Sequence, residues 1–237
     1  MAAGLASIAI GTLLLRSYGP RVRVGRLLAV TPSVSVGQAR EMAIAGIRSY
    51  VRVHGRLDAD DEFPDENHRP LVFRRRRLET RRGRAWHVLD EHVESVPFRI
   101  GEGLEEIEVD LGALDVGLVT LVRESVGTVE EAGGALDPGV RASLPPSAIV
   151  RLRIEQLSSV EQATVLGMPL ALPDGRVAIS AGTGRPLVVC TLARDEAMRV
   201  LAGGERARPA AAAVALAGGL LGLALGLAWA LLADGLG

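Results

Sequence analysis

The residue types best suited to chemistry in this sequence lie in a short polar segment around residue 90. Asp90, His92 and Glu94 occupy alternate positions. Alternate residues of a β-strand share a face, so these side chains could offer a divalent metal one nitrogen and two carboxylates. The competing interpretation is a solvated strand face whose carboxylates pair with nearby arginines, a common pattern. We favour the solvated face, and we predict no metal site and no cofactor.

The remaining reactive residues are few. His54 and Asp58 form another spaced pair, which is no more specific, and the single cysteine, Cys190, lies in the apolar run "LVVCTL". A free cysteine in such a strand is usually buried and inert. We find no Gly-rich phosphate loop and no nucleophile elbow. We therefore predict no catalytic residues.

A basic segment at residues 73–87, "FRRRRLETRRGRAWH", contains seven arginines. It is bracketed by acid, because residues 58–66 carry six carboxylates and residues 88–110 carry eight. The whole chain has a net charge of −1 and only 3% aromatic residues, which argues against a nucleic-acid partner. We predict a self-neutralised hairpin with a basic strand at Arg74, Arg75, Arg76 and Arg77, and anionic lipid headgroups stay open as an alternative partner.

Both ends of the chain are apolar. Residues 210–233 contain neither charge nor proline, which predicts a transmembrane helix within 209–233. Residues 1–18 predict a shorter N-terminal anchor, with Arg16 and Tyr18 at the interface. A cleaved signal peptide is the alternative for this first segment, although its positive charge follows the apolar run instead of preceding it.

Small residues recur at four-residue spacing in both end segments. Ala3, Ser7 and Gly11 form one stripe in the first. Small residues let helices approach closely in lipid, so the two segments could pack as a hairpin, or the second could pack on a copy of itself. The alternative is that Gly and Ala are simply common in this chain. The second stripe, the predicted helix-packing site, comprises Gly218, Gly222, Gly226 and Ala230.

Arginines flank the inner side of each apolar segment, at 16–26 and 194–208, and neither outer end carries one. The positive-inside rule then places the intervening domain in the cytoplasm and both termini outside. The prediction is a two-pass protein of the cell membrane.

The middle of the chain predicts a mainly β (α+β) domain at 28–205. Thr31-Pro32 is typical of a helix start, and a short helix is expected near 36–44. Alternating apolar and polar residues predict strands near 47–59, 71–79, 85–100, 105–111 and 118–126, and a further set between 149 and 192. Residues 127–148, rich in Gly and Pro, predict a loop or link, and residues 193–204 predict a helix. Strand lengths and turn spacing favour a small barrel of OB or SH3-like type.

The order of several segments resembles a known family. The segments are "VRVHGRLDADD", "RPLVFRRRRLE", "SVPFRI", "IEVD", "ATVLG" and "PLVVCTLARDEAMRVL", set between two apolar ends. Together they resemble the GIDE-type, or beside-a-membrane (BAM), domain, best known from a mitochondrial membrane-anchored ubiquitin ligase. The likeness covers residues 28–205 and both anchors. Prokaryotic members of the family often carry Cys-Val where this chain has Leu71-Val72.

The resemblance implies a ubiquitin-ligase label, which the residue types do not support. A RING needs eight Cys or His ligands, and this chain has one Cys and four His. We therefore expect a membrane-anchored, non-enzymatic interaction or scaffold protein. Its partners would be the bilayer, an unidentified protein or a copy of itself. A ubiquitin-ligase-like protein without its RING and a metal-dependent hydrolase using His92 are the alternatives.

Overall fold

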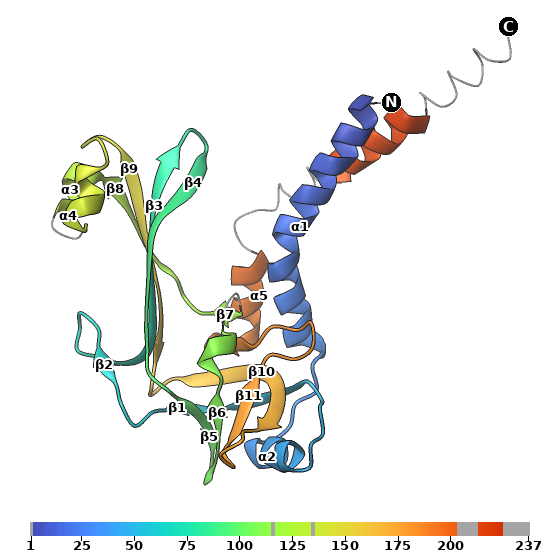
Figure 1. The fold of residues 1–237 in the computed structure, drawn as a ribbon, viewed down its shortest axis with the longest axis vertical. Helices are drawn as coiled ribbons and strands as arrows, with labels where there is room; N and C mark the ends of the chain where they lie inside the picture. Colours follow the sequence, from blue (N-terminus) through green and yellow to red (C-terminus); the bar gives the residue numbers. More distant parts are fainter. Residues whose placement is uncertain (1, 115–116, 134–135, 203–212, 225–237) are drawn as a thin grey trace, which may run out of the picture. The chain divides into compact units, whose positions relative to one another are not determined.

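A computed structural model of the 237-residue chain describes residues 2–114, 117–133, 136–202 and 213–224. The chain divides into two compact units, and we describe each by itself (Figure 1). The terminal unit joins Met1–Val30 to Arg194–Gly237, and the central unit is Thr31–Ala193. The central unit is mainly β, as the sequence predicts, and its bounds are narrower than the expected 28–205.

The first part of the central unit is a closed five-stranded barrel. Its strands pair in the order β1-β5-β6-β11-β10, and β10 pairs back to β1. Every pairing is antiparallel except that of β6 with β11. Strands β1, β5 and β6 form an antiparallel meander, and the hairpin of β10 and β11 closes the barrel with β11 parallel to β6. This is the Greek-key connectivity of OB-type barrels. The strands are β1 (Val51–Asp58), β5 (Arg99–Glu102), β6 (Glu105–Val109), β10 (Gln162–Ala171) and β11 (Val177–Ser180).

Two short strands extend the barrel sheet beyond β10. They are β12 (Val188–Cys190), which pairs with β10, and β7 (Leu118–Val119), which runs parallel to β12. The 118–126 segment was predicted as one strand, but it breaks after β7. A separate strand, β8 (Arg123–Thr128), joins a second sheet.

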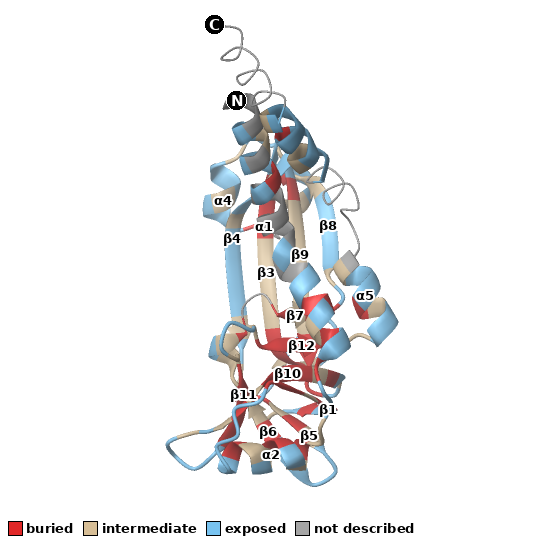
Figure 2. Cartoon of the chain, turned by 90° about the vertical axis from the view of Figure 1, so that its right-hand side faces the viewer, coloured by how far each residue is buried: buried red, intermediate tan, exposed pale blue. Residues whose placement is uncertain are grey.

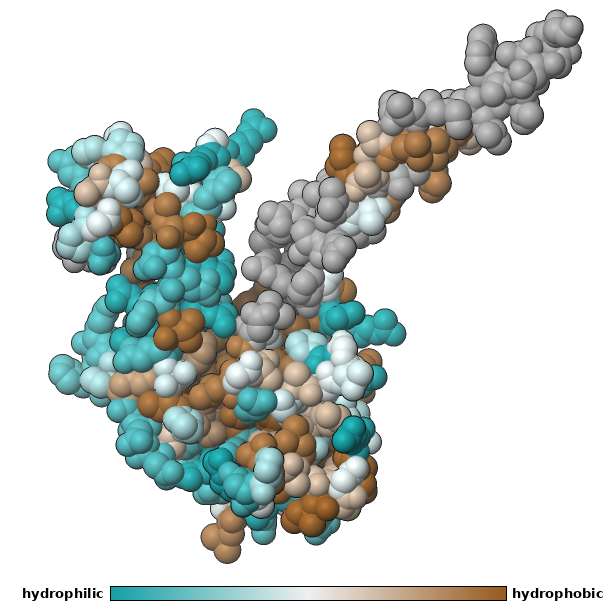
Figure 3. Space-filling view, in the orientation of Figure 1, coloured by the Kyte–Doolittle hydropathy of each residue, from teal (hydrophilic) through white to brown (hydrophobic). Residues whose placement is uncertain are grey.

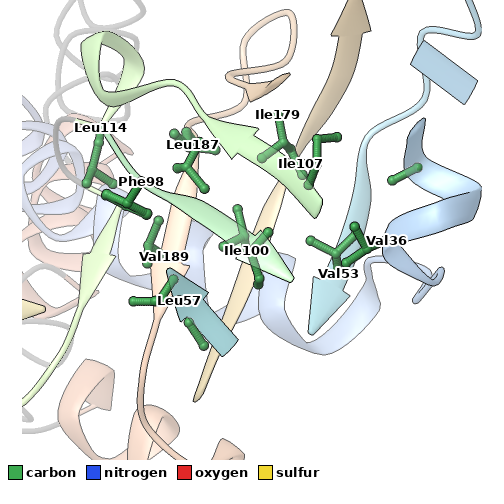
Figure 4. Packing of buried hydrophobic residues seen from close by; sticks show 14 of the residues in the cluster. Val36, Val53, Leu57, Phe98, Ile100, Ile107, Leu114, Ile179, Leu187 and Val189 are labelled. Atoms are coloured by element: carbon green, nitrogen blue, oxygen red, sulfur yellow. The ribbon is translucent and has the colours of Figure 1, made fainter. Parts of the chain in front are cut away.

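The barrel interior holds the main hydrophobic core (Figure 4). Val53 and Leu57 alternate on β1 with exposed polar residues, so that strand contributes one face to the core. The helix α2 (Val36–Ile44) packs Val36, Ala39 and Ala43 into the same core. Its predicted position was correct but its predicted cap was wrong, because Ser35, with Gln38, forms the capping box.

The second sheet is formed by two insertions between strands of the barrel. Between β1 and β5 the chain makes the hairpin of β3 and β4, and between β6 and β10 it makes β8 and β9. The long central strands β3 and β9 pair along almost their whole length, and β4 forms an exposed edge (Figure 2). The strands are β2 (Phe63–Pro64), β3 (Pro70–Arg82), β4 (Ala85–Ser95), β8 and β9 (Ile149–Ser158).

Residues 127–148 are more structured than a loop. They contain two short helices, α3 (Val129–Ala132) and α4 (Pro138–Ala142), each with a capping side chain, from Thr128 and Asp137. Val129 and Leu136 close a small core with Leu78 and Val150 on the second sheet. The helices therefore cover one face of that sheet. A 3-10 turn, η1 (Leu111–Ala113), follows β6.

The terminal unit consists of helices. The first, α1 (Ala2–Val30), is 29 residues long and continues well beyond the predicted anchor at 1–18. The second, α5 (Arg194–Ala202), lies within the helix predicted at 193–204, and residues 213–224 form a third. Among the described residues, no helix combines the length and the apolar character needed to cross a membrane. The remainder of the predicted 209–233 segment, including Gly226 and Ala230, lies outside the described residues.

Candidate functional site

The predicted basic strand is a real strand, and its alternation separates the four arginines onto two faces. On β3, Arg75 and Arg77 point to one face of the second sheet, and Arg74 and Arg76 to the other. The hairpin with β4 places Arg74 opposite Glu94, Arg76 opposite His92 and Arg77 opposite Glu91. The turn between the strands uses Gly83 at φ 61, a conformation that glycine adopts freely.

The face that carries Arg75 and Arg77 is a lattice of ion pairs. Arg77 donates through Nε and Nη2 to the two oxygens of Glu91, at 3.1 and 3.0 Å. These hydrogen bonds lower the pKa of Glu91 and raise that of Arg77. Arg75 lies 3.5 Å from Glu91 and 3.3 Å from Glu155 on β9. The predicted charge compensation is therefore present on this face.

The lattice continues toward β8 through Arg151 on β9. This guanidinium bonds the buried carboxylate of Glu79 on β3, with Nε 2.6 Å from Oε2. It also lies 3.4 Å from Glu124 and stacks over the Trp86 ring at 4.3 Å. A polyanion at this face would have to displace carboxylates that are already in place.

The opposite face is only partly neutralised. Arg74 pairs with Glu94 and sits over the Phe63 ring, 5.3 Å from its centroid. Arg76 makes no ion pair with any part of the chain that the structure describes, although it lies opposite His92. It is thus the exception among the four arginines.

The metal cluster that we considered as the alternative does not assemble among the described residues. Asp90, His92 and Glu94 do share a face of β4, as their spacing indicates. Glu94, however, is bound by Arg74, and no three His, Cys, Asp or Glu side chains within the described ranges converge as metal ligands. Of the two carboxylates, Glu94 is paired with an arginine and Asp90, among the described residues, is not, so the arginine-paired face that we favoured is present in part.

The other candidate residues have structural surroundings. His54 contacts the hydroxyl of Thr164 at 3.2 Å, and Asp58 pairs with Arg99 at 3.2 Å. Cys190 is buried in β12, and burial raises the pKa of its thiol, which keeps it protonated.

The small residues near the N-terminus make the contact that their spacing indicates. Ser7 Oγ donates a 2.7 Å hydrogen bond to the carbonyl of Ala215, and a Cβ on Gly11 would lie 2.7 Å from Leu216 Cγ. The helix at 213–224 presents Ala215 and buried Gly219 in this register. Gly218 has no atom within 4 Å of its Cβ position, and Gly222 is exposed. Gly218 therefore makes no close helix contact among the described residues, and the contact of these glycines with a second copy stays a prediction.

Sequence reasoning missed two features. Asp137 and Val140, in the segment taken for a loop, line a pocket together with Arg76 and His92. Asp65 is a buried carboxylate that accepts hydrogen bonds from the backbone N–H groups of Asn67 and Arg69. An Asp in a loop often accepts a hydrogen bond from the backbone N–H two residues on, and this tendency could have indicated the second feature.

Three comparisons with known proteins give no match: no family model, no curated protein and no solved structure is similar to this chain at a significant level.

Proposed function

We propose that this chain is a membrane-anchored, non-enzymatic interaction protein. An OB-type barrel with a second sheet forms the recognition domain, and the paired apolar ends of the chain hold it at the bilayer. The GIDE-type resemblance and the cytoplasmic position of the domain are part of this proposal.

The observation that carries the proposal is the pairing of the two chain ends. Ser7 and Ala215, 208 positions apart, are joined by a side chain to backbone hydrogen bond. Gly11 allows Leu216 to approach the α1 backbone closely. Small residues and a serine hydrogen bond are the means by which helices associate in lipid, where the hydrophobic effect does not drive them together. Two apolar ends that recognise each other are well suited to act as one anchor.

The surface chemistry supports an interaction role over catalysis. Within the described parts of the chain, no three His, Cys, Asp or Glu residues could hold a metal ion, and Cys190 is buried. The arginine-rich face is occupied by carboxylates. On β5 and β6, the strands that OB folds commonly use for binding, Arg99 is held by Asp58, Asp60 and Glu106. These features favour a protein or headgroup partner over a nucleic acid.

The side of the membrane can be tested with single cysteines. The native Cys190 would be replaced by serine, and Leu104→Cys would report on the central unit, since Leu104 is fully exposed. In intact cells, a membrane-impermeant maleimide is expected to leave this position unlabelled until the cells are permeabilised. Labelling of intact cells would contradict a cytoplasmic domain.

The interaction role itself is tested by crosslinking the intact protein in its own membrane. A defined partner, or a second copy of the chain, is expected to be recovered in stoichiometric amount. Turnover of a substrate by the purified protein, including ubiquitin transfer, would contradict a non-enzymatic role.

A further inference from the structure

Two adjoining pockets lie on the face of the second sheet that α3 and α4 cover. One has a volume of about 220 Å³ and the other about 320 Å³. They share Leu78, Leu136 and Leu152 as lining residues, so they are neighbours on the same sheet face. Figure 3 shows apolar surface in this area, between α3, α4 and the β3–β4 hairpin. The larger pocket reaches the lower end of the size range of small-molecule sites, roughly 300 Å³.

The two pockets differ in chemistry. The larger one is lined mostly by apolar and small groups, among them Val150, Ala132 and Gly127. The smaller one adds four polar side chains to the shared leucines: Arg76, Asp90, His92 and Asp137. A ligand that fills both would therefore have an apolar body and a polar head.

Arg76 is the group that distinguishes this site from a solvated surface. Arg74, Arg75 and Arg77, its neighbours along β3, are each bound to a carboxylate. Arg76 forms no ion pair within the described residues, although Asp90 and Asp137 line the same pocket. A half-buried guanidinium is a strong, donor-only site for a carboxylate.

The two aspartates provide the complementary sites. Asp137 uses Oδ1 to accept from the backbone N–H of Gly139 at 2.8 Å, which fixes its side chain beside the pocket that it lines. Asp90 makes no ion pair with the described part of the chain. Ionised carboxylates only accept hydrogen bonds, so they suit a donor such as an ammonium group.

We propose that this groove binds a small apolar amino acid, or a closely similar zwitterion. Its carboxylate pairs with Arg76, its ammonium group with Asp90 and Asp137, and its side chain lies on Leu78, Leu136 and Leu152. A simple anion would meet two aspartates, and a simple cation would meet Arg76. A hydrocarbon would leave all of these charged groups without partners. This site is independent of the membrane anchor.

The test is titration calorimetry of the full-length chain in lipid nanodiscs, with empty nanodiscs as the blank. L-leucine and L-phenylalanine are the probes, at up to millimolar concentration. Saturable binding is expected. Isopentylamine and 4-methylpentanoate, which each lack one charge of leucine, are expected to bind about tenfold to a hundredfold more weakly, since each loses a charged hydrogen bond.

Arg76→Gln should weaken leucine binding by the same roughly tenfold to hundredfold factor. The matched control is Arg77→Gln, on the opposite face of the same strand, which should bind as the unaltered chain does. Val140→Trp, which fills the smaller pocket, should abolish binding, and circular dichroism will verify that each variant is folded. The proposal is overturned by the absence of saturable binding, by normal binding to folded Arg76→Gln, or by equal affinity for leucine and 4-methylpentanoate.

Discussion

Glu79 and Arg151 face each other across β3 and β9, with Nε of Arg151 2.6 Å from Oε2 of Glu79. Only 7% of the Glu79 side chain and 17% of the Arg151 side chain is exposed. Removal of one member of a largely buried pair leaves the other charge uncompensated, which is costly. Glu79→Gln is therefore expected to lower the free energy of unfolding by about 2–4 kcal/mol, measured by denaturant titration.

The control for this prediction is the more exposed ion pair between Arg77 and Glu91. Glu91 pairs with Arg77 on the same face, but its side chain is 36% exposed, so Glu91→Gln should cost no more than about 1 kcal/mol. If both variants lose the same stability, burial does not determine the strength of the lattice.

The closure of the barrel depends on a glycine in β1. A Cβ on Gly55 would lie 2.2 Å from the carbonyl oxygen of Gly101 on β5, and backbone atoms cannot move aside easily. Gly55→Ala should destabilise the fold by roughly 2–4 kcal/mol. In Gly37→Ala, by contrast, the new Cβ meets its nearest neighbour, Glu105, at an ordinary 3.5 Å. Because Gly37 is in helix α2, that change should be neutral or stabilising by about 0.5–1 kcal/mol. Thermal unfolding will distinguish the two, and equal midpoints would contradict the close strand approach.

Asp65 should make stability depend on pH in the acid range. The Arg69 backbone N–H, followed by the Arg69 side chain and the Asn67 N–H, lowers the pKa of Asp65 from 3.8 to about 2, against the opposing effect of burial. A depressed folded-state pKa stabilises the protein above the unfolded value, and that stability is lost as the pH falls through the folded value. The difference in unfolding free energy between the unaltered chain and Asp65→Asn should shrink between about pH 4 and pH 2.

The control for the pH prediction is Asp61→Asn, an exposed aspartate between β1 and β2. At neutral pH this variant should have nearly the same free energy of unfolding as the unaltered chain, because the side chain is exposed. If the difference in unfolding free energy between the unaltered chain and Asp65→Asn stays constant over this pH range, the pKa of Asp65 is not lowered in the folded protein.

The pairing of the chain ends predicts a specific crosslink. With Cys190 replaced by serine, the double variant Ser7→Cys and Ala215→Cys should form an intramolecular disulfide on mild oxidation, because Ser7 Oγ lies 2.7 Å from the backbone carbonyl oxygen of Ala215. Gly11→Ile should reduce its yield, since a side chain there would collide with Leu216. Gly19→Ile is the control, because no atom lies within 4 Å of its Cβ position. Unchanged yield with Gly11→Ile would contradict this packing.

Much of the central unit could be predicted from local patterns. The alternation of apolar residues in 51–58 and 105–109 places those strands correctly, and the acid on both sides of the arginines indicates their pairing on β3. A small barrel was predicted, but the strands that close it were not, because the pairing of β1 with β10 joins residues more than a hundred positions apart. The parallel pairing of β6 with β11 leaves no local signal for the same reason.

The pocket was not predicted, because the composition of residues 127–148 indicated the wrong local structure. Gly and Pro suggested a loop at 127–148, but Asp137 and Thr128 are helix caps there, and the chain folds back over the sheet. Strand alternation, which the sequence indicates, places Arg76 on the opposite face from Arg75 and Arg77. The pocket beside Arg76 also requires α4 to lie over that face, and only the tertiary structure determines this.

Membrane anchoring is tested by alkaline carbonate extraction of membranes from cells that express this chain. An anchored protein is expected to stay in the membrane pellet. Release into the supernatant is expected when Leu220, Leu221 and Leu223 are all changed to arginine, because each arginine placed within the bilayer costs about 2.5–3.5 kcal/mol. The control variant carries the same change at three exposed central positions, Ile44, Leu104 and Leu121, and should remain in the pellet. Release of the unaltered chain into the supernatant would contradict membrane anchoring.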